Sequence, residues 1–163
     1  MTTRPRWVFL VATGLALAGL VAAWALWWGP AAPPPALLRT DDAQLLERGR
    51  QVYVAQCASC HGVNREGQAH WRERGADGRL PAPPHDETGH TWHHPDELLF
   101  RITKEGVAQA AGLTDYESNM PTYGGTLSDA DIVAVLSWIK SQWPAQTQAQ
   151  HDAINRQAWE ARR

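Results

Sequence analysis

Cys57, Cys60 and His61 stand together in the run Cys-Ala-Ser-Cys-His, directly after a stretch with helical spacing. Two cysteines three positions apart lie about one helical turn from each other. This C-x-x-C-H pattern is typical of covalent haem attachment, in which the two thiols reach the vinyl groups on one edge of the porphyrin. The next side chain then places its imidazole under the iron. The pattern therefore predicts one haem c, bound covalently through Cys57 and Cys60, with His61 as an axial iron ligand.

A pair of cysteines at this spacing has two other common uses. Thioredoxin-like oxidoreductases use it for thiol–disulfide exchange, but that site follows a strand, whereas this pair follows a helix and no βαβ pattern surrounds it. A zinc site would need imidazoles in addition to the two thiolates, and His85, His90, His93 and His94 are the candidates. Thiol redox chemistry and zinc binding are the two minor alternatives for the motif.

Met120 is the chain's single methionine besides the initiator, and it stands in the sequence NMPTY at residues 119–123. Iron in an electron carrier needs a sixth ligand, and a thioether sulfur favours the ferrous state and raises the reduction potential. Pro121 restricts the backbone beside this sulfur. Most methionines only fill a core, but the upstream motif favours Met120 as the second axial iron ligand. The histidines of residues 85–94 are the main competitors.

Residues 7–28 contain no charged side chain over 22 positions, which is enough for a helix to cross ~30 Å of hydrocarbon at ~1.5 Å per residue. Arg4 and Arg6 precede this run, so the N-terminus is expected to stay in the cytoplasm while the rest of the chain crosses. We therefore expect residues 1–28 to form an N-terminal transmembrane helix. The alternative is a signal peptide that is cleaved after Ala23.

Three further segments follow the expected anchor. Residues 29–40 hold four prolines and predict a stiff, extended linker. Residues 41–144 are expected to form the folded domain. Residues 145–163 form a polar C-terminal tail, in which Ile154, Ala158 and Trp159 have spacings that a short amphipathic helix would use. The sequence does not decide whether this tail docks onto the domain.

Helix signals within the domain are clear, and strand signals are absent. Asp41 is expected to cap a helix over about residues 42–56. A second helix is expected to begin at Pro95 and to stop at Gly106. A third is expected to start at Ser128, with Asp131 three residues on as in a capping box, and to end before Pro144. Because no segment alternates with period two, the domain is predicted to be all-α. The 33 residues from Gly62 to His94 are rich in Gly and Pro, and a large bound cofactor would explain so long an irregular stretch.

The charge of the chain argues against nucleic acid as a partner. The formal net charge is -2, and no basic stripe of the kind that phosphate backbones require is present. Residues 105–131 carry five acidic side chains, Glu105, Asp115, Glu117, Asp129 and Asp131, and no Lys or Arg lies among them. This group is interpreted as a solvated acidic surface, and a docking face for a basic partner is the alternative.

Four features together resemble the class I cytochrome c family over about residues 41–143. They are the pair Gly49-x-x-x-Tyr53, the C-x-x-C-H motif, the Met-Pro-x-Tyr sequence that begins at Met120, and an aromatic residue in the last helix. The resemblance implies an all-α cytochrome c-like fold around one covalently bound haem. It also implies that Gly49 and Tyr53 pack against the last helix, at Val135 and Trp138, and a glycine permits two helices to cross closely.

The stretch from residue 81 to residue 95 is similar to segments of membrane-anchored bacterial c-type cytochromes. The family often uses a proline after the haem motif to support the proximal histidine, and Pro81, Pro83 and Pro84 are all candidates here. Trp92 is a candidate donor to a haem propionate, with an ordinary packed aromatic as the equal alternative. The four histidines of this stretch also raise the hypothesis of a copper site, although its prolines and glycine fix no ligand spacing.

The resemblance implies an electron carrier and not an enzyme. With His61 and Met120 on the iron, no coordination position is open to a small-molecule substrate. The expected partners are redox proteins of the membrane electron-transport chain, and the expected location is a bacterial inner membrane with the haem domain on the periplasmic side. The alternatives are a haem-bearing subunit of a larger oxidoreductase and a copper-binding accessory protein that delivers metal.

Overall fold

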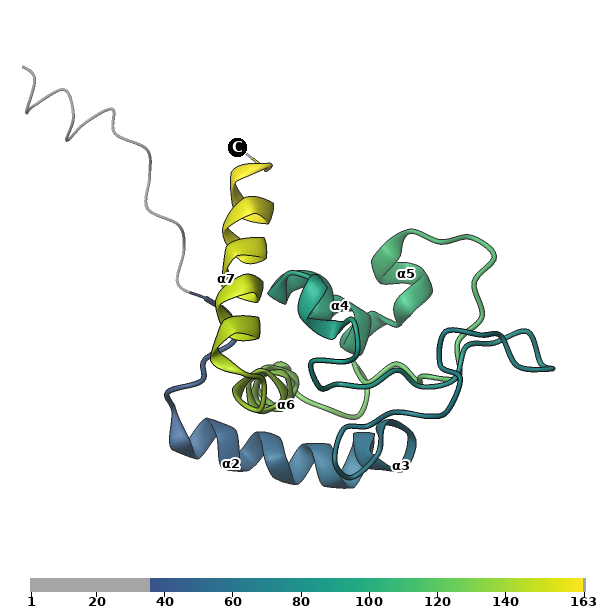
Figure 1. The fold of residues 1–163 in the computed structure, drawn as a ribbon, viewed down its shortest axis with the longest axis horizontal. Coiled ribbons are helices and arrows are strands. Elements are labelled where there is room, and N and C mark those ends of the chain that lie inside the picture. The colour runs from purple at the N-terminus through teal and green to yellow at the C-terminus, as the bar shows by residue number, and fades with distance from the viewer. Residues whose placement is uncertain (1–35, 163) are drawn as a thin grey trace, which may run out of the picture. The chain divides into compact units, whose positions relative to one another are not determined.

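A computed structural model describes residues 36–162 (Figure 1). Its elements in chain order are α2 (Ala43–Val52), the π-helical turn η1 (Tyr53–Cys57), α3 (Ala58–His61), the 3-10 turn η2 (Thr91–His93), α4 (Asp96–Glu105), α5 (Val107–Ala111), α6 (Asp129–Ser141) and α7 (Ala145–Glu160). Residues 36–162 contain no strand, so the all-α prediction is confirmed for this part of the chain.

The predicted membrane anchor, residues 1–28, lies outside the described residues, as does most of the linker at residues 29–40. Among the helices from residue 36 to residue 162, none combines the length and the apolar character that crossing a bilayer demands. The anchor therefore stays a prediction.

The first helical stretch is longer than the sequence indicated. Asp42, and not Asp41, is the N-cap: its side chain accepts a hydrogen bond from the amide of Leu45 at 3.0 Å. After α2 the backbone continues through one π-helical turn, in which the Ala58 amide bonds to the carbonyl of Tyr53, and then into α3, which ends at His61. The local widening of the helix leaves no trace in hydrophobic spacing, so the predicted end at residue 56 was wrong.

One of the other predicted helix boundaries is shifted by one residue, and one short helix was missed. Pro95 has extended backbone angles and is the N-cap of α4, so the first helical residue is Asp96. Gly106 ends α4 with φ 92°, a conformation that other residues rarely adopt. The chain begins α5 immediately afterwards at Val107. A helix of five residues is too short to give a periodic signal.

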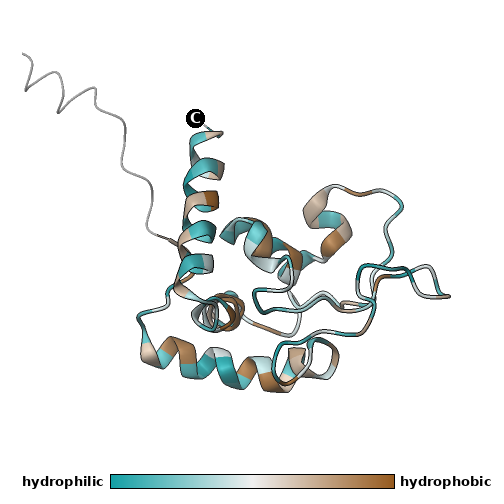
Figure 2. Cartoon of the chain, in the orientation of Figure 1, coloured by the Kyte–Doolittle hydropathy of each residue, from teal (hydrophilic) through white to brown (hydrophobic). Residues whose placement is uncertain are grey.

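The predicted cap of the last domain helix is confirmed. The Ser128 side chain accepts a hydrogen bond from the amide of Asp131 at 3.2 Å, and the Asp131 carboxylate accepts from the amide of Ser128 at 3.2 Å. This reciprocal capping box satisfies two backbone donors at the start of α6. Figure 2 shows that apolar residues are concentrated on α6, which supplies four of the core side chains, Ile132, Val135, Leu136 and Ile139.

Helices α2 and α6 cross at Gly49. A β-carbon at this position would lie 2.0 Å from the backbone oxygen of Ala134, so no side chain fits between the two helices. One turn later Tyr53 is fully buried, and its ring centroid lies 4.7 Å from that of Trp138. The close crossing that the resemblance implied, with Val135 buried beside it, is present.

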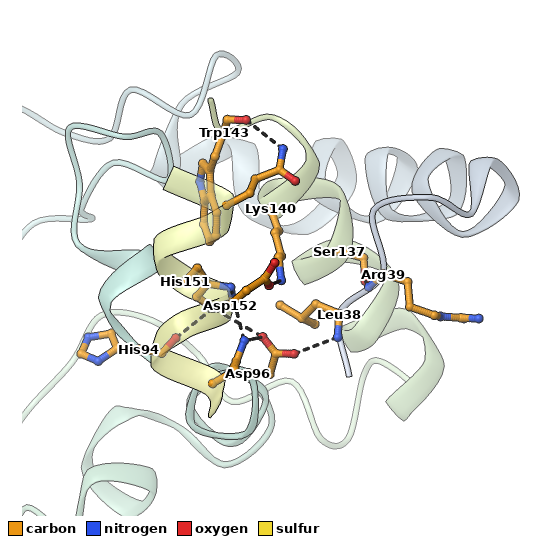
Figure 3. A network of polar contacts seen from close by, with 11 residues as sticks. Leu38, Arg39, His94, Asp96, Ser137, Lys140, Trp143, His151 and Asp152 are labelled. Carbon is orange, nitrogen blue, oxygen red and sulfur yellow. Dashed lines mark hydrogen bonds and ion pairs between the residues drawn. The ribbon is translucent and has the colours of Figure 1, made fainter. Parts of the chain in front are cut away.

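The C-terminal segment is a folded helix and not a mobile tail. His151 on α7 is fully buried, and its Nε2 donates to the carbonyl of His94 at 3.0 Å (Figure 3). Asn155 exchanges two hydrogen bonds with Asp96, at 2.7 and 2.9 Å, and Asp152 pairs with the buried ammonium of Lys140 at 2.5 Å. The docked face of α7 is thus largely polar, which is why hydrophobic spacing could not decide its position.

Candidate functional site

A cavity of about 680 Å³ lies in the domain, and all four residues with predicted roles at a haem line it: Cys57, Cys60, His61 and Met120. This volume falls within the range of roughly 300–1,000 Å³ that is typical of ligand and cofactor pockets. The two cysteines and the histidine come from η1 and α3, whereas Met120 comes from an irregular segment after α5. The fold therefore brings together the two motifs that the sequence singled out separately.

The state of the cysteines fits attachment better than thiol exchange. Both thiols are free, with Cys57 half-buried and Cys60 exposed. Burial raises the pKa of the Cys57 thiol to about 11, whereas thiol exchange requires a thiolate, which a lowered pKa favours. Within residues 36–162, moreover, no three His, Cys, Asp or Glu side chains gather where they could hold a metal ion. Neither the thiol-redox nor the zinc alternative gains support.

His61 is oriented by a single backbone contact. The side chain is 7% exposed, and its Nδ1–H donates to the carbonyl of Pro83 at 2.8 Å. Burial lowers the pKa of His61, so the imidazole is neutral and its Nε2 carries a free lone pair. Of the three prolines that the sequence left as candidates, Pro83 is the one that supports the histidine. A backbone acceptor on Nδ1 is a common way to fix the tautomer of a metal-binding histidine.

The segment that carries Met120 is tied to the rest of the domain on both sides. After the methionine, the Tyr123 hydroxyl donates to the carbonyl of Gln56 at 2.8 Å, directly before the first cysteine. Before the methionine, the guanidinium of Arg79 bonds to Glu117 at 2.9 Å and to the side-chain oxygen of Asn119 at 2.9 Å. These contacts link the Met120 segment to the cysteine-bearing helix and to the loop around residue 79.

The histidine-rich stretch does not form a metal cluster. His85 stacks on His61, with centroids 4.0 Å apart, and its Nδ1 is hydrogen-bonded to Thr91 at 2.8 Å. His93 stacks on Trp92 instead, with centroids 3.6 Å apart. The copper interpretation therefore finds no set of three ligating side chains among the described residues. His85, His90 and His94 line the cavity nonetheless.

Trp92 does not have the role suggested for it. Its indole N–H donates to the backbone carbonyl of Glu87 at 3.2 Å, and the residue is not among those that line the cavity. The packed-aromatic alternative describes it correctly. The sequence could not show this, because the path of a long irregular segment decides which of its tryptophans faces the cavity.

The acidic group at residues 105–131 is largely neutralised by ion pairs with basic residues elsewhere in the chain. These pairs are Glu105 with Arg101, Glu117 with Arg79, Asp129 with Lys104, and Asp131 with Arg48. No observation therefore favours the alternative of an acidic docking face. The basic partners lie outside residues 105–131, so a count of charges over that segment alone overstated how acidic this surface is.

The remaining cavity wall suits a large, flat, mostly apolar group. Helices α4 and α6 contribute an apolar surface, made by Leu98, Leu99, Ile102, Val135, Leu136 and Ile139. The described residues that line the cavity include no Asp or Glu. The donor set, two thiols, a neutral imidazole and a thioether, fits a covalently attached haem. Sequence reasoning missed Trp71, Arg72 and Tyr116 in this wall, because they lie in irregular segments without a motif.

Comparison with known proteins agrees with this chemistry. The family model described as Cytochrome c matches residues 46–143, which is more than half of the 163-residue chain. Searches of curated proteins and of solved structures returned no match. Proteins of this family bind covalently attached haem c, and their typical role is to carry electrons; Cys57 and Cys60 fit the attachment motif. The chain, with its cavity lined by both cysteines and His61, belongs to the cytochrome c family.

Proposed function

We propose that this protein is a class I, monohaem electron carrier in which His61 and Met120 are the axial ligands of the iron. The observation that carries the proposal is that the C-x-x-C-H motif and Met120, far apart in sequence, line one cavity. Haem, when bound, supplies the one-electron ferrous–ferric chemistry. The residues of the chain attach it, orient it and keep water and substrates from its iron.

His61 and Met120 divide the axial positions between a nitrogen and a sulfur donor. Pro83 holds Nδ1 of the histidine, so that Nε2 is the nitrogen left to ligate. The ties of Tyr123 and Arg79 to their neighbours hold the methionine segment over the cavity. With both positions taken by protein side chains, no position is open to a substrate, and the protein acts as a carrier and not as an enzyme.

The proposed location follows from the N-terminal sequence. Residues 7–28 hold no charge and are preceded by Arg4 and Arg6, which supports a single-pass anchor in a bacterial inner membrane. The Pro-rich linker at residues 29–40 would then hold the haem domain on the periplasmic side, within reach of redox proteins of the membrane electron-transport chain. Because α7 packs on its own domain, nothing favours the alternative of a subunit that uses this segment to bind a larger oxidoreductase.

Ligation is tested with the full chain matured by haem-attachment machinery. The haem is expected to stay on the chain after denaturation and to be lost from it in the Cys57→Ala/Cys60→Ala variant. Ferrous wild-type protein is expected not to bind carbon monoxide, whereas Met120→Ala binds it. Leu113→Ala, an exposed apolar position outside the cavity, is the matched control and is expected to behave like wild type. Binding of carbon monoxide by the wild-type protein would contradict the proposed ligation.

The anchor is tested by fractionating cells that produce the full chain. Haem-stained protein is expected in the membrane fraction after an alkaline wash. Replacing residues 1–28 with a cleavable signal is expected to release the same haem protein into the periplasm. Release of the unaltered chain by the wash would show that the N-terminal segment is not a retained anchor.

A further inference from the structure

His85 is a cavity residue to which the proposed function assigns no role. Its ring lies flat against the ring of His61, with centroids 4.0 Å apart and planes at 23°. The hydrogen bond from Nδ1 of His61 to the Pro83 carbonyl fixes one edge of the His61 ring but places no atom on its face. The stacked ring of His85 covers a face, so it limits how far the His61 ring can tilt or turn.

Hydrogen bonds hold both the backbone and the ring of His85. Its amide donates to the carbonyl of Arg65 at 2.8 Å, and its carbonyl accepts from the indole N–H of Trp143 at 2.8 Å. Nδ1 of its ring is hydrogen-bonded to the Thr91 hydroxyl at 2.8 Å, and Thr91 is buried. A ring that is fixed in this way gives the group stacked on it a defined position.

Filling space does not explain a histidine at this position. An apolar side chain would close the wall of an apolar cavity equally well, whereas an imidazole withdrawn from water costs free energy unless its polar atoms find partners. The buried hydroxyl of Thr91 supplies such a partner. His93, in the same stretch, is a useful contrast: it also stacks on an aromatic ring, that of Trp92, but it is exposed and does not line the cavity.

The C-terminal helix α7 supports the residue that holds the His85 carbonyl. This residue, Trp143, is buried and packs edge-on against His151, with centroids 5.2 Å apart (Figure 3). The side-chain amide of Gln148 donates to the Trp143 carbonyl at 2.9 Å. His151 and Gln148 both lie on α7, after residue 143, where the match to the family model ends. A segment outside that match is thus connected by direct contacts to the ring that stacks on His61.

We propose that His85 is a positioning residue for the axial ligand His61, and that α7 holds His85 in place through Trp143. The stack fixes the plane of the His61 imidazole, while the Pro83 carbonyl fixes its edge. Neighbours that orient a ligating histidine also tune the metal that it binds. The C-terminal helix then acts on the haem site although none of residues 145–160 lines the cavity. This inference rests on the proposed function, since it takes His61 as an axial ligand.

The test compares His85→Phe with His85→Leu in the full, haem-loaded and oxidised chain. Both variants lose the hydrogen bond to Thr91, but only phenylalanine keeps a flat ring against His61. The g values in the electron paramagnetic resonance spectrum of low-spin ferric haem depend on the plane of the axial imidazole. The largest g value is expected to shift in His85→Leu and to stay close to the wild-type value in His85→Phe. An equal shift in both variants, or no shift in His85→Leu, overturns the positioning role.

His93→Leu is the matched control. It removes an imidazole that is stacked on Trp92, outside the cavity, and is expected to leave the g values unchanged. A shift as large as that of His85→Leu would show that the spectrum does not report the stack on His61, and would overturn the inference.

The route from α7 is tested with Trp143→Phe, which removes the indole N–H and keeps an aromatic ring. This variant is expected to shift the largest g value in the same direction as His85→Leu, and to add no further shift when the two substitutions are combined. No shift in Trp143→Phe alone, or the same shift in both backgrounds, overturns this route. The sulfur-to-iron band is read from the same samples. Its absence from the wild-type protein is a different result, because it overturns the proposed ligation, whereas its presence with unchanged g values in every variant overturns only the inference.

Discussion

Replacing Gly49 with alanine tests the close crossing of α2 and α6. The new β-carbon would lie 2.0 Å from the oxygen and 2.6 Å from the carbon of the Ala134 carbonyl, and 2.8 Å from the β-carbon of Trp138. All three are backbone or β-carbon atoms, so no change of rotamer relieves the overlap. Bringing the shortest contact out to 3.0 Å requires α2 and α6 to separate by 1.0 Å (3.0 − 2.0).

The expected magnitude follows from two opposing effects. Overpacking of this kind costs about 1–3 kcal/mol, and a clash with backbone belongs at the upper end. Alanine gains about 1 kcal/mol over glycine in a helix interior, which offsets part of this cost. The net loss is about 2 kcal/mol, and for a chain of this size it corresponds to a decrease in Tm of about 4–8 °C.

The assay is thermal unfolding of the haem-loaded chain, followed by far-ultraviolet circular dichroism. Gly125→Ala is the control, because a β-carbon at Gly125 meets no atom within 4 Å and this glycine does not have a positive φ. If Gly49→Ala melts at the same temperature as Gly125→Ala, or above wild type, then the two helices do not cross as closely as described.

Three further variants probe other parts of the domain. Ser128→Ala removes the capping box of α6 and is expected to lower the free energy of unfolding by about 0.5–2 kcal/mol in urea titrations. Arg79→Gln removes one tie of the Met120 segment, so the far-red sulfur-to-iron band is expected to disappear at a lower pH than in wild type. Burial lowers the pKa of His151 below that of the unfolded chain, so stability is expected to fall as the pH drops below about 6.5, and His151→Gln is expected to reduce this slope.

Each of these outcomes has a contrary result. An unchanged urea midpoint in Ser128→Ala would mean that the cap contributes nothing to stability. A band in Arg79→Gln that titrates as in wild type would remove the positioning role of the ion pair. Because the pKa of His151 is lowered in the folded state, the unfolded state binds the proton more readily, and stability is expected to fall on acidification. A stability that rises on acidification would contradict a neutral, buried imidazole at this position.

Local signals in the sequence predicted much of the helical framework. The Ser128 capping box and the stop at Gly106 depend on neighbouring residues only, and both are present in the structure. The resemblance to the cytochrome c family predicted that Gly49 and Tyr53 pack against the last domain helix. The close crossing of α2 and α6 gives the physical reason for the glycine. The errors of one residue at Asp41 and Pro95 reflect a general property of helix ends, where cap geometry and not spacing decides the boundary.

What the sequence could not predict depends on contacts between distant segments. The docking of α7 relies on buried polar pairs such as His151 with His94, which have no periodic signature. The path of a long irregular segment decides which proline supports His61 and which tryptophan lines the cavity. The proline is Pro83, and the tryptophan is Trp71 and not Trp92. Only the motif residues of the site could be named in advance, because only their chemistry is visible in sequence.

The central claim, a single-electron carrier with His61 and Met120 on a covalently bound haem, is tested most directly by a spectroelectrochemical titration of the matured chain beside Met120→Ala. The account predicts a one-electron transition with a sulfur-to-iron band in the oxidised wild-type spectrum. It also predicts that Met120→Ala loses this band and has a lower reduction potential. A band that is absent from the wild-type protein, or that survives the substitution with an unchanged potential, would contradict the account.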